Sequence, residues 1–177
     1  MLLRHVGVWV IACLTLSSLH LAAFEDQNHV YTITFPEGWT VDESDSNNIA
    51  WVIARSPAEE KGNPFLENIQ ITYNQKASNT LLNEYLPDLL VFMKEKYADV
   101  EIMEIGSTEL ADRTAKWVLF TSQGPGDTGE PVRLKAIHYA LVAGKHLMII
   151  LCVAPIDRFD ASRPTFEKSL KTLKFLK

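Results

Sequence analysis

The chain has little cysteine, and it has no pair that could form a disulfide bond inside the folded part. Its 177 residues include two cysteines, Cys13 and Cys152. Cys13 lies in an N-terminal segment that we expect to be removed, which leaves Cys152 alone. A domain of this length buries enough apolar surface to fold without a disulfide. Because Cys152 lies within the apolar run 149–153, we expect it to be a small buried hydrophobic residue rather than a nucleophile.

Histidine and catalytic signatures are also scarce. Beyond the N-terminal segment only His29, His138 and His146 remain, whereas zinc needs three or four ligands that converge on one point. We expect His138 and His146 either on opposite faces of a sheet or about 13 Å apart along the strands. The chain shows no serine with the flanking glycines of a nucleophile elbow, no paired acids at helical spacing in a cleft, and no glycine-rich dinucleotide fingerprint. The sequence therefore indicates no catalytic residue, no metal ligand and no cofactor.

Long apolar runs are missing except at the N terminus. Residues 1–23 have a short basic start with Arg4 and His5, continue as an apolar run from Val6 to Leu16, and end in the small residues Ala22 and Ala23. This layout is typical of a secretory signal peptide. Three polar residues between positions 17 and 20 interrupt the run before the roughly 20 apolar residues that a membrane span needs. We expect cleavage near Ala22 or Ala23, with lipid attachment at Cys13 and an uncleaved anchor as less favoured alternatives.

Basic residues are outnumbered by acidic ones, 17 to 22, so nucleic acid is not an expected partner. The charge is uneven, because residues 24–131 carry 7 basic and 19 acidic side chains and residues 132–177 carry 9 and 3. We interpret this as solvated acidic loops and a basic final helix. An alternative is attraction of the closing segment to an anionic membrane surface. That segment contains six cations: Arg158, Arg163, Lys168, Lys171, Lys174 and Lys177.

The first part of the folded region reads as strands. Tyr31–Phe35 alternates apolar and polar residues, and Pro36 and Gly38 predict a type I turn over residues 35–38 that leads into a second strand at Trp39–Val41. We expect these two strands to pair as the first hairpin. Residues 49–54 and 69–73 read as further strands. Before them, residues 42–48 form an oxygen-rich stretch that we interpret as a loop without the spacing of a calcium-binding EF-hand, with an irregular cation site as the less favoured alternative.

Two segments have helical spacing. Apolar residues recur every three or four positions from Leu81 to Tyr97, after Ser78 or Asn79 as the N-cap, and Pro87 predicts a kink or break inside that helix. A second helix is expected from about Asp160 to Leu173, with Pro164 in its first turn. The residues expected in its buried stripe are Phe166, Leu170 and Leu173.

Four strands lie between the two helices, at residues 100–105, 115–122, 132–143 and 146–154. Gly144 and Lys145 predict a type II′ hairpin in which Ala143 opposes His146 and Ile137 opposes Cys152. Both faces of this hairpin are mostly apolar and need cover. The sequence therefore predicts an α+β fold with a mostly antiparallel sheet and helices on both faces, in a single domain from residue 24 to residue 177.

The stretch from Gly124 to Pro131 is the most loop-like part of the chain. It joins two strands and contains the acidic residues Asp127 and Glu130, so it does not fit a phosphate-binding loop. We interpret it as a long hairpin connection. Its alternative role is a partner-binding loop in which Asp127 and Glu130 make the contacts.

The first strand ends in Phe35-Pro36-Glu37-Gly38-Trp39, and the closing helix is followed by Leu173-Lys174-Phe175. With the helix that begins near Leu81 and the strands after it, this pattern resembles the PsbP-like and DcrB-like proteins, an α/β/α sandwich superfamily with exported bacterial members. The residues at 110–113 lack the glycine common at that turn in the family. The resemblance implies a fold and no catalytic residues.

Taken with the N-terminal segment, these observations predict an exported, non-enzymatic accessory domain of the cell envelope or secreted fraction. Its partner would be another protein or an envelope component. Two alternatives stay open: a small exported hydrolase with an unrecognised site, and a protein that binds lipid or a membrane surface.

Overall fold

A computed structural model describes residues 23–28, 30–46, 49–57, 65–74, 81–126, 129–144 and 146–176. Seven of its strands are β3 (Thr40–Ser46), β4 (Ile49–Arg55), β5 (Asn68–Asn74), β6 (Ala98–Leu110), β7 (Arg113–Pro125), β8 (Pro131–Ala143) and β9 (His146–Pro155). They form an antiparallel sheet in the order β3-β4-β5-β9-β8-β7-β6. The helices are α1 (Leu81–Lys96) and α2 (Phe159–Leu170). The α+β class and the mostly antiparallel sheet are confirmed.

Three short strands form a separate small sheet that ties the two ends of the described chain together. They are β1 (Phe24–Glu25), β2 (Tyr31–Ile33) and β10 (Lys174–Phe175), and β2 lies in the middle. Both pairings are antiparallel. The backbone N–H of Thr34 also donates to the side-chain hydroxyl of Thr172 at 2.8 Å.

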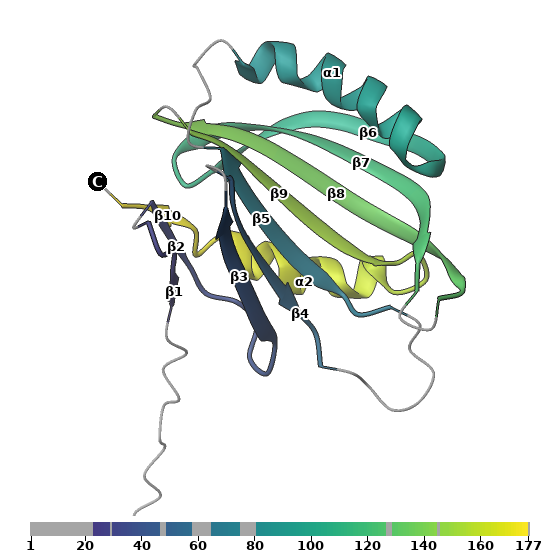
Figure 1. Ribbon diagram of the computed structural model, residues 1–177, viewed down its shortest axis with the longest axis horizontal. Helices are drawn as coiled ribbons and strands as arrows, with labels where there is room; N and C mark the ends of the chain where they lie inside the picture. Colours follow the sequence, from purple (N-terminus) through teal and green to yellow (C-terminus); the bar gives the residue numbers. More distant parts are fainter. Residues whose placement is uncertain are drawn as a thin grey trace, which may run out of the picture.

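Alternate residues of the large sheet belong to two different apolar clusters. One contains the α1 residues Leu89 and Met93 together with Val118, Phe120, Leu134, Ala136 and Val153. The other contains Phe159, Phe166 and Leu170 of α2, with sheet residues such as Ile71, Ile137, Tyr139 and Ile150. Figure 1 shows α1 and α2 on opposite sides of the large sheet. We call these two sides the α1 face and the α2 face.

The β8–β9 hairpin has the register that its turn residues predict. Ala143 lies opposite His146, Leu141 opposite Met148 and Ile137 opposite Cys152. Gly144 has a φ of 62°, as the first loop residue of a type II′ turn requires. This hairpin joins the two halves of the sheet, because β9 also pairs with β5.

The predicted first hairpin is wrong. Tyr31–Ile33 pairs with β1 and β10, whereas Thr40–Ser46 pairs with β4 in the other sheet. The alternation of apolar residues identified a strand, but it carries no information about which distant segment pairs with it. The partner Lys174–Phe175 lies more than a hundred residues away in the sequence.

The turn after β2 is also shifted by one residue from its prediction. The N–H of Trp39 donates to the carbonyl oxygen of Pro36 at 3.3 Å, so the turn runs from Pro36 to Trp39. Gly38 occupies its third position with a φ of 78°. A positive φ at that position defines a type II turn, and it is the position where glycine is preferred.

Two further sequence interpretations are corrected by the sheet and the first helix. The stretch from Asp42 to Ser46 is part of β3 rather than a loop, because its backbone pairs with β4 and Asp42 forms an ion pair with Arg55. Helix α1 continues through Pro87, so of the two predicted alternatives the break is wrong. Pro87 is exposed. Because proline has no backbone N–H, the carbonyl oxygen of Asn83 lacks its helical donor, and on this exposed side water can donate to it instead. The proposed caps at Ser78 and Asn79 lie outside the described residues.

Helix α2 ends earlier than predicted, at Leu170, and its Pro164 lies in the second turn. Leu173 is nevertheless buried at the end of the same stripe, as are Phe166 and Leu170. The three residues therefore contribute to the core as expected.

Candidate functional site

The two side chains with nucleophile or base chemistry at the centre of the sheet lie on opposite faces. Cys152 is fully buried in the α2-face cluster, and this burial raises the pKa of its thiol. His138 is on the other face, where its Nε2 lies 3.1 Å from the hydroxyl of Tyr85 in α1. Burial lowers the pKa of His138 to about 4, so the ring is neutral near pH 7. A thiol that stays protonated and an imidazole on the far side of the sheet do not form a catalytic pair.

His146 does not share a site with His138. Its ring contacts Tyr73 edge to face, with centroids 5.8 Å apart, and Tyr73 belongs to the α2-face cluster. His29 lies outside the described residues. Among the residues that the structure describes, no three His, Cys, Asp or Glu side chains are grouped as metal ligands would be.

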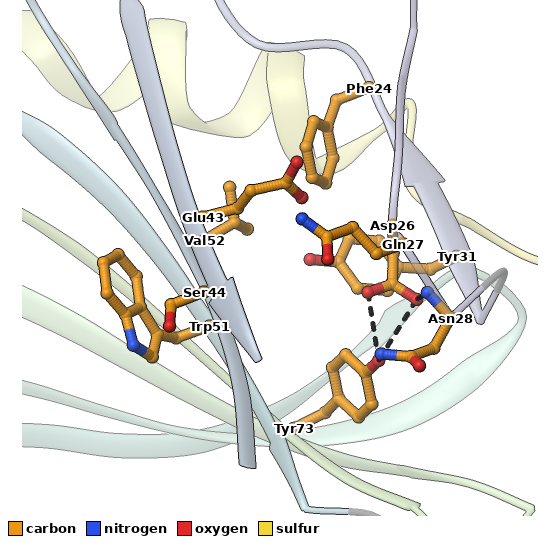
Figure 2. Close-up of a pocket in the computed structure, with 10 residues that line it drawn as sticks. All are labelled: Phe24, Asp26, Gln27, Asn28, Tyr31, Glu43, Ser44, Trp51, Val52 and Tyr73. Carbon is orange, nitrogen blue, oxygen red and sulfur yellow. Dashed lines mark hydrogen bonds between the residues drawn. The ribbon is translucent and has the colours of Figure 1, made fainter. Parts of the chain in front are cut away.

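A small polar cavity lies between the N-terminal segment and the large sheet (Figure 2). The buried carboxylate of Asp26 accepts hydrogen bonds from the Tyr73 hydroxyl at 3.0 and 3.2 Å and from the backbone N–H of Val30 at 3.0 Å. Asn28 donates to the Tyr73 oxygen at 2.7 Å. The cavity measures about 10 Å³, which is the space of at most one water molecule. We interpret this network as a structural one that attaches the N-terminal segment to the large sheet.

A much larger groove of about 410 Å³ lies on the α2 face, between α2 and strands β6, β7 and β8. Its volume is within the range of small-ligand and side-chain pockets. Gly106, Trp117 and Tyr139 form one row across its floor, because Gly106 lies opposite Trp117 and Trp117 opposite Tyr139. The floor is therefore largely aromatic.

Gly106 determines how Trp117 lies on this floor. A Cβ atom at position 106 would come within 2.6 Å of Cε2 of the indole ring, closer than real atoms approach. The ring can thus lie directly over the backbone of the outermost strand only because residue 106 has no side chain. Trp117 is half-buried, so part of the ring faces the groove.

The wall of the groove is formed by α2 and is charged. Arg163 and Glu167 form an ion pair one turn apart, with Nε and Oε1 at 2.9 Å, and Lys171 follows one turn later. The phenol of Tyr139 lies below them, and burial raises its pKa to about 12. The hydroxyl therefore stays protonated and can donate a hydrogen bond at any physiological pH. An aromatic floor beside charged and hydroxyl groups is suited to binding a partly apolar group.

Comparisons with known proteins identify the fold of the chain. No protein-family model matches the chain, and no curated protein matches it in sequence. Among solved structures, the cyanobacterial PsbP (CyanoP) from Synechocystis sp. PCC 6803 superimposes with a TM-score of 0.60 at 13% identity, covering 87% of this chain and 91% of that one. The chain has the PsbP-like fold.

Other solved structures share the PsbP-like fold. LpqN, described as involved in cell envelope biogenesis of Mycobacterium tuberculosis, matches with a TM-score of 0.62 at 8% identity, over 88% of this chain and 90% of that one. A Pseudomonas aeruginosa protein of unknown function matches with a TM-score of 0.59 at 12% identity, over 86% of this chain and 95% of that one. At such identities the likeness concerns the fold, and the site must be argued from this chain's own residues.

Sequence reasoning placed Trp117 in a strand of the PsbP-like fold but did not identify the groove. Tryptophan in a strand is more often core or half-buried sheet surface than a ligand platform, and Trp117 is indeed half-buried against the α2-face cluster. The available signal was Gly106, an isolated glycine in a strand pattern, which indicates a close approach to the backbone. No sequence pattern shows that α2 leaves the β6 side of its face open.

The predicted contact residues of the Gly124–Pro131 loop are only partly described. Asp127 lies outside the described residues, and Glu130 is exposed. The connection is shorter than predicted, since β7 extends to Pro125 and β8 begins at Pro131. Within it, the N–H of Gly126 donates to the carbonyl oxygen of Glu130 at 2.9 Å. A partner-binding role for this loop stays a prediction.

The cations of the closing segment are partly engaged within the fold. Arg158 forms an ion pair with Glu67 at 3.1 Å and donates to the carbonyl oxygen of Phe65, and Arg163 pairs with Glu167. Lys168, Lys171 and Lys174 are exposed, and Lys177 lies outside the described residues. Across the described ranges, no helix combines the length and apolar character needed to cross a bilayer.

Proposed function

We propose that this protein is an exported, non-enzymatic accessory domain that binds another protein or an envelope component in the groove between α2 and strands β6 to β8. The observation that carries the proposal is the groove itself: about 410 Å³ of open space over Trp117 and Tyr139, on a face that α2 otherwise covers. A rigid sheet with a partly apolar groove is a common basis for binding.

Export is supported by the sequence of residues 1–23. Of these, residues 1–22 lie outside the part of the chain that the structure describes. Their basic start, apolar centre and small final residues are typical of a cleaved leader. A solved neighbour with the same fold, LpqN, is described as involved in cell envelope biogenesis. An intact mass of the protein purified from its host distinguishes cleavage near Ala23 from lipid attachment at Cys13, because the two leave different N termini.

The non-enzymatic part of the proposal is supported by the state of the reactive side chains. Burial keeps Cys152 protonated and His138 neutral, and the two lie on opposite faces. A screen of the purified protein against ester, peptide and glycoside substrates tests the alternative of a small hydrolase. Turnover that survives repeated purification would overturn the non-enzymatic proposal.

The binding groove is tested by filling it without disturbing the core. Thr108 is exposed on β6 and lines the groove, so Thr108→Arg places a long charged side chain in it. Thr114 is also exposed. Its neighbour Ala115 belongs to the α2-face cluster, so the side chain of Thr114 points to the other face, away from the groove, and Thr114→Arg is the matched control. We expect affinity purification from envelope or secreted fractions to recover a stoichiometric partner with the wild type and Thr114→Arg, but not with Thr108→Arg. Equal recovery with all three would contradict a site in this groove.

The loop with Asp127 and Glu130 is proposed as a second contact for the same partner. The loop joins β7 and β8 at the ends of these strands that lie far from the groove. Trp117 in the groove is eight residues before Pro125 at the end of β7, which is about 26 Å along a strand. The two sites can therefore be tested separately. A double change of Asp127→Ala and Glu130→Ala that leaves partner affinity unchanged would remove the loop from the proposal.

A further inference from the structure

Strand β6 is the outermost strand on one side of the large sheet. In the described part of the chain it pairs only with β7. Its residues from 103 to 109 are exposed except for Gly106. Such an edge presents backbone N–H and C=O groups that can pair with a further strand.

The register of the β6–β7 hairpin determines which residues of β6 direct their backbone N–H and C=O groups to the free edge of the sheet. Leu110 and Arg113 flank a two-residue loop, so they form a hydrogen-bonded pair, and the hydrogen-bonded pairs recur at every second residue. Residues 104, 106, 108 and 110 therefore bond to β7. Ile105, Ser107 and Glu109 direct their N–H and C=O groups to the free edge.

Only this second half of β6 is regular enough to accept a partner strand. The pairing with β7 is interrupted by irregularities between Ala98 and Glu101 and between Ile102 and Glu104. From Glu104 to Leu110 the register continues without a break. Seven regular residues match the length of an ordinary strand.

The charge of this edge selects the kind of strand that can bind. Residues 98–112 contain five acidic side chains and no basic one. They are Asp99, Glu101, Glu104, Glu109 and Asp112. A second copy of the chain would place carboxylates against carboxylates, which disfavours pairing of two β6 edges. A segment rich in lysine or arginine has the complementary charge.

The edge is also continuous with the groove. Ser107, Thr108, Glu109 and Leu110 of β6 line the groove together with Trp117. Because Gly106 has no side chain, nothing at that position separates the free edge from the indole ring of Trp117. An apolar side chain of an added strand can thus reach over Gly106 to the aromatic floor.

We propose that β6 accepts an extended basic peptide segment of a partner protein as an eighth strand of the sheet. Backbone hydrogen bonds form with Ile105, Ser107 and Glu109. One large apolar side chain of the segment enters the groove over Gly106, and its cationic side chains lie on the opposite face, beside Glu109. This inference rests on the proposed function, since it names the kind of partner that the groove binds.

A proline at position 107 tests the backbone part of the proposal. Ser107→Pro removes one outward N–H without breaking a bond to β7, and the preceding residue is glycine, which tolerates the restriction that proline imposes. Ser107→Ala keeps the N–H and loses only the hydrogen bond from Lys116. The probe is a fluorescein-labelled heptapeptide in which four lysines alternate with valine, phenylalanine and valine. We expect micromolar binding to the wild type and to Ser107→Ala, and at least tenfold weaker binding to Ser107→Pro with an unchanged circular dichroism spectrum.

Charge reversal provides a test that misfolding cannot imitate. The double variant Glu104→Lys and Glu109→Lys should bind the lysine heptapeptide at least tenfold more weakly than the wild type does. It should bind the same peptide with glutamate in place of lysine more tightly than the wild type does. Both affinities should fall as salt is raised, since the charged groups are exposed.

The outcomes separate this inference from the proposed function. Failure of the wild type to bind the lysine heptapeptide, or equal binding by Ser107→Pro and Ser107→Ala, would overturn strand addition at β6. Partner recovery that is lost only in Thr108→Arg would still support the groove. Loss of strand addition together with equal partner recovery by all variants would overturn both.

Discussion

The two faces of the large sheet differ in how they are covered. The α2 face has the larger cluster, which includes α2, residues of the small sheet and the aromatic contacts of Phe166 with Trp39 and Phe159 at 6.3 and 6.0 Å. The α1 face has a smaller cluster and contains a half-buried polar pair, Tyr85 and His138. The groove nevertheless lies on the more extensively packed face. Because the groove is bordered by well-packed residues, its walls are held in place, unlike a surface that is only loosely covered.

The largest effect should come from removing an aromatic side chain on the α2 face. Phe166 is 1% exposed and Met93, its counterpart on the α1 face, is 0% exposed. We expect Phe166→Ala to lower the free energy of unfolding by about 3–5 kcal/mol and Met93→Ala by a smaller amount, toward the lower end of about 2–5 kcal/mol. Urea denaturation measures both. A larger loss for Met93→Ala would reverse the comparison between the faces.

The next effect is a loss of stability in acid that originates on the α1 face. Burial lowers the pKa of His138 from 6.5 to about 4. Between these values the unfolded chain binds a proton that the folded chain does not, so stability falls as the pH falls. The difference corresponds to about 3 kcal/mol when the whole range is crossed.

The control for this pH dependence is His138→Gln, which keeps an acceptor for the Tyr85 hydroxyl and does not titrate. Unfolding free energies measured from pH 7 to pH 4 should decline less steeply for this variant than for the wild type. Parallel curves for the two proteins would show that His138 is not the group responsible.

A smaller effect is expected at the floor of the groove. Gly106→Ala forces the Trp117 ring away from the backbone of β6, because the new Cβ would lie 2.6 Å from Cε2 of the ring. Overpacking of this kind costs about 1–3 kcal/mol. The indole N–H signal of Trp117 in a ¹⁵N-correlated NMR spectrum should move, whereas in Ser107→Ala it should stay in place. An unchanged indole signal in Gly106→Ala would mean that the ring does not rest on Gly106.

The smallest effect concerns the β6–β7 turn at the end of the groove. Ala111 and Asp112 have φ values of 49° and 58°, which is the conformation of a type I′ turn. Asparagine and glycine adopt this conformation with less strain than alanine and aspartate do. We therefore expect Ala111→Asn with Asp112→Gly to raise the unfolding free energy by about 1 kcal/mol. A melting temperature that does not rise would argue against strain at this turn.

The sequence predicted features that depend on neighbouring residues. Gly144 and Lys145 fixed the β8–β9 register correctly, and that register placed Cys152 and His138 on opposite faces. The apolar spacing identified Phe166, Leu170 and Leu173 as core residues. These predictions succeeded because turn chemistry and side-chain periodicity act over a few residues.

Features that depend on distant segments were not predictable in the same way. The pairing of Tyr31–Ile33 with Lys174–Phe175 and the inclusion of Asp42–Ser46 in a strand are decided by tertiary contacts. The groove arises from where α2 crosses the sheet, and only the isolated Gly106 hinted at it. Long-range packing can override local propensity, as it does in β3.

The central claim is that the partner binds on the α2 face beside β6, and photo-crosslinking from the two faces tests it most directly. A photoreactive amino acid is placed at Thr108, in the groove, or at Val91, which is 59% exposed on α1, and each variant is irradiated in its native host. We expect a discrete adduct from position 108, absent when the Ser107→Pro change is added, and none from position 91. An adduct from position 91 without one from position 108 would contradict the account.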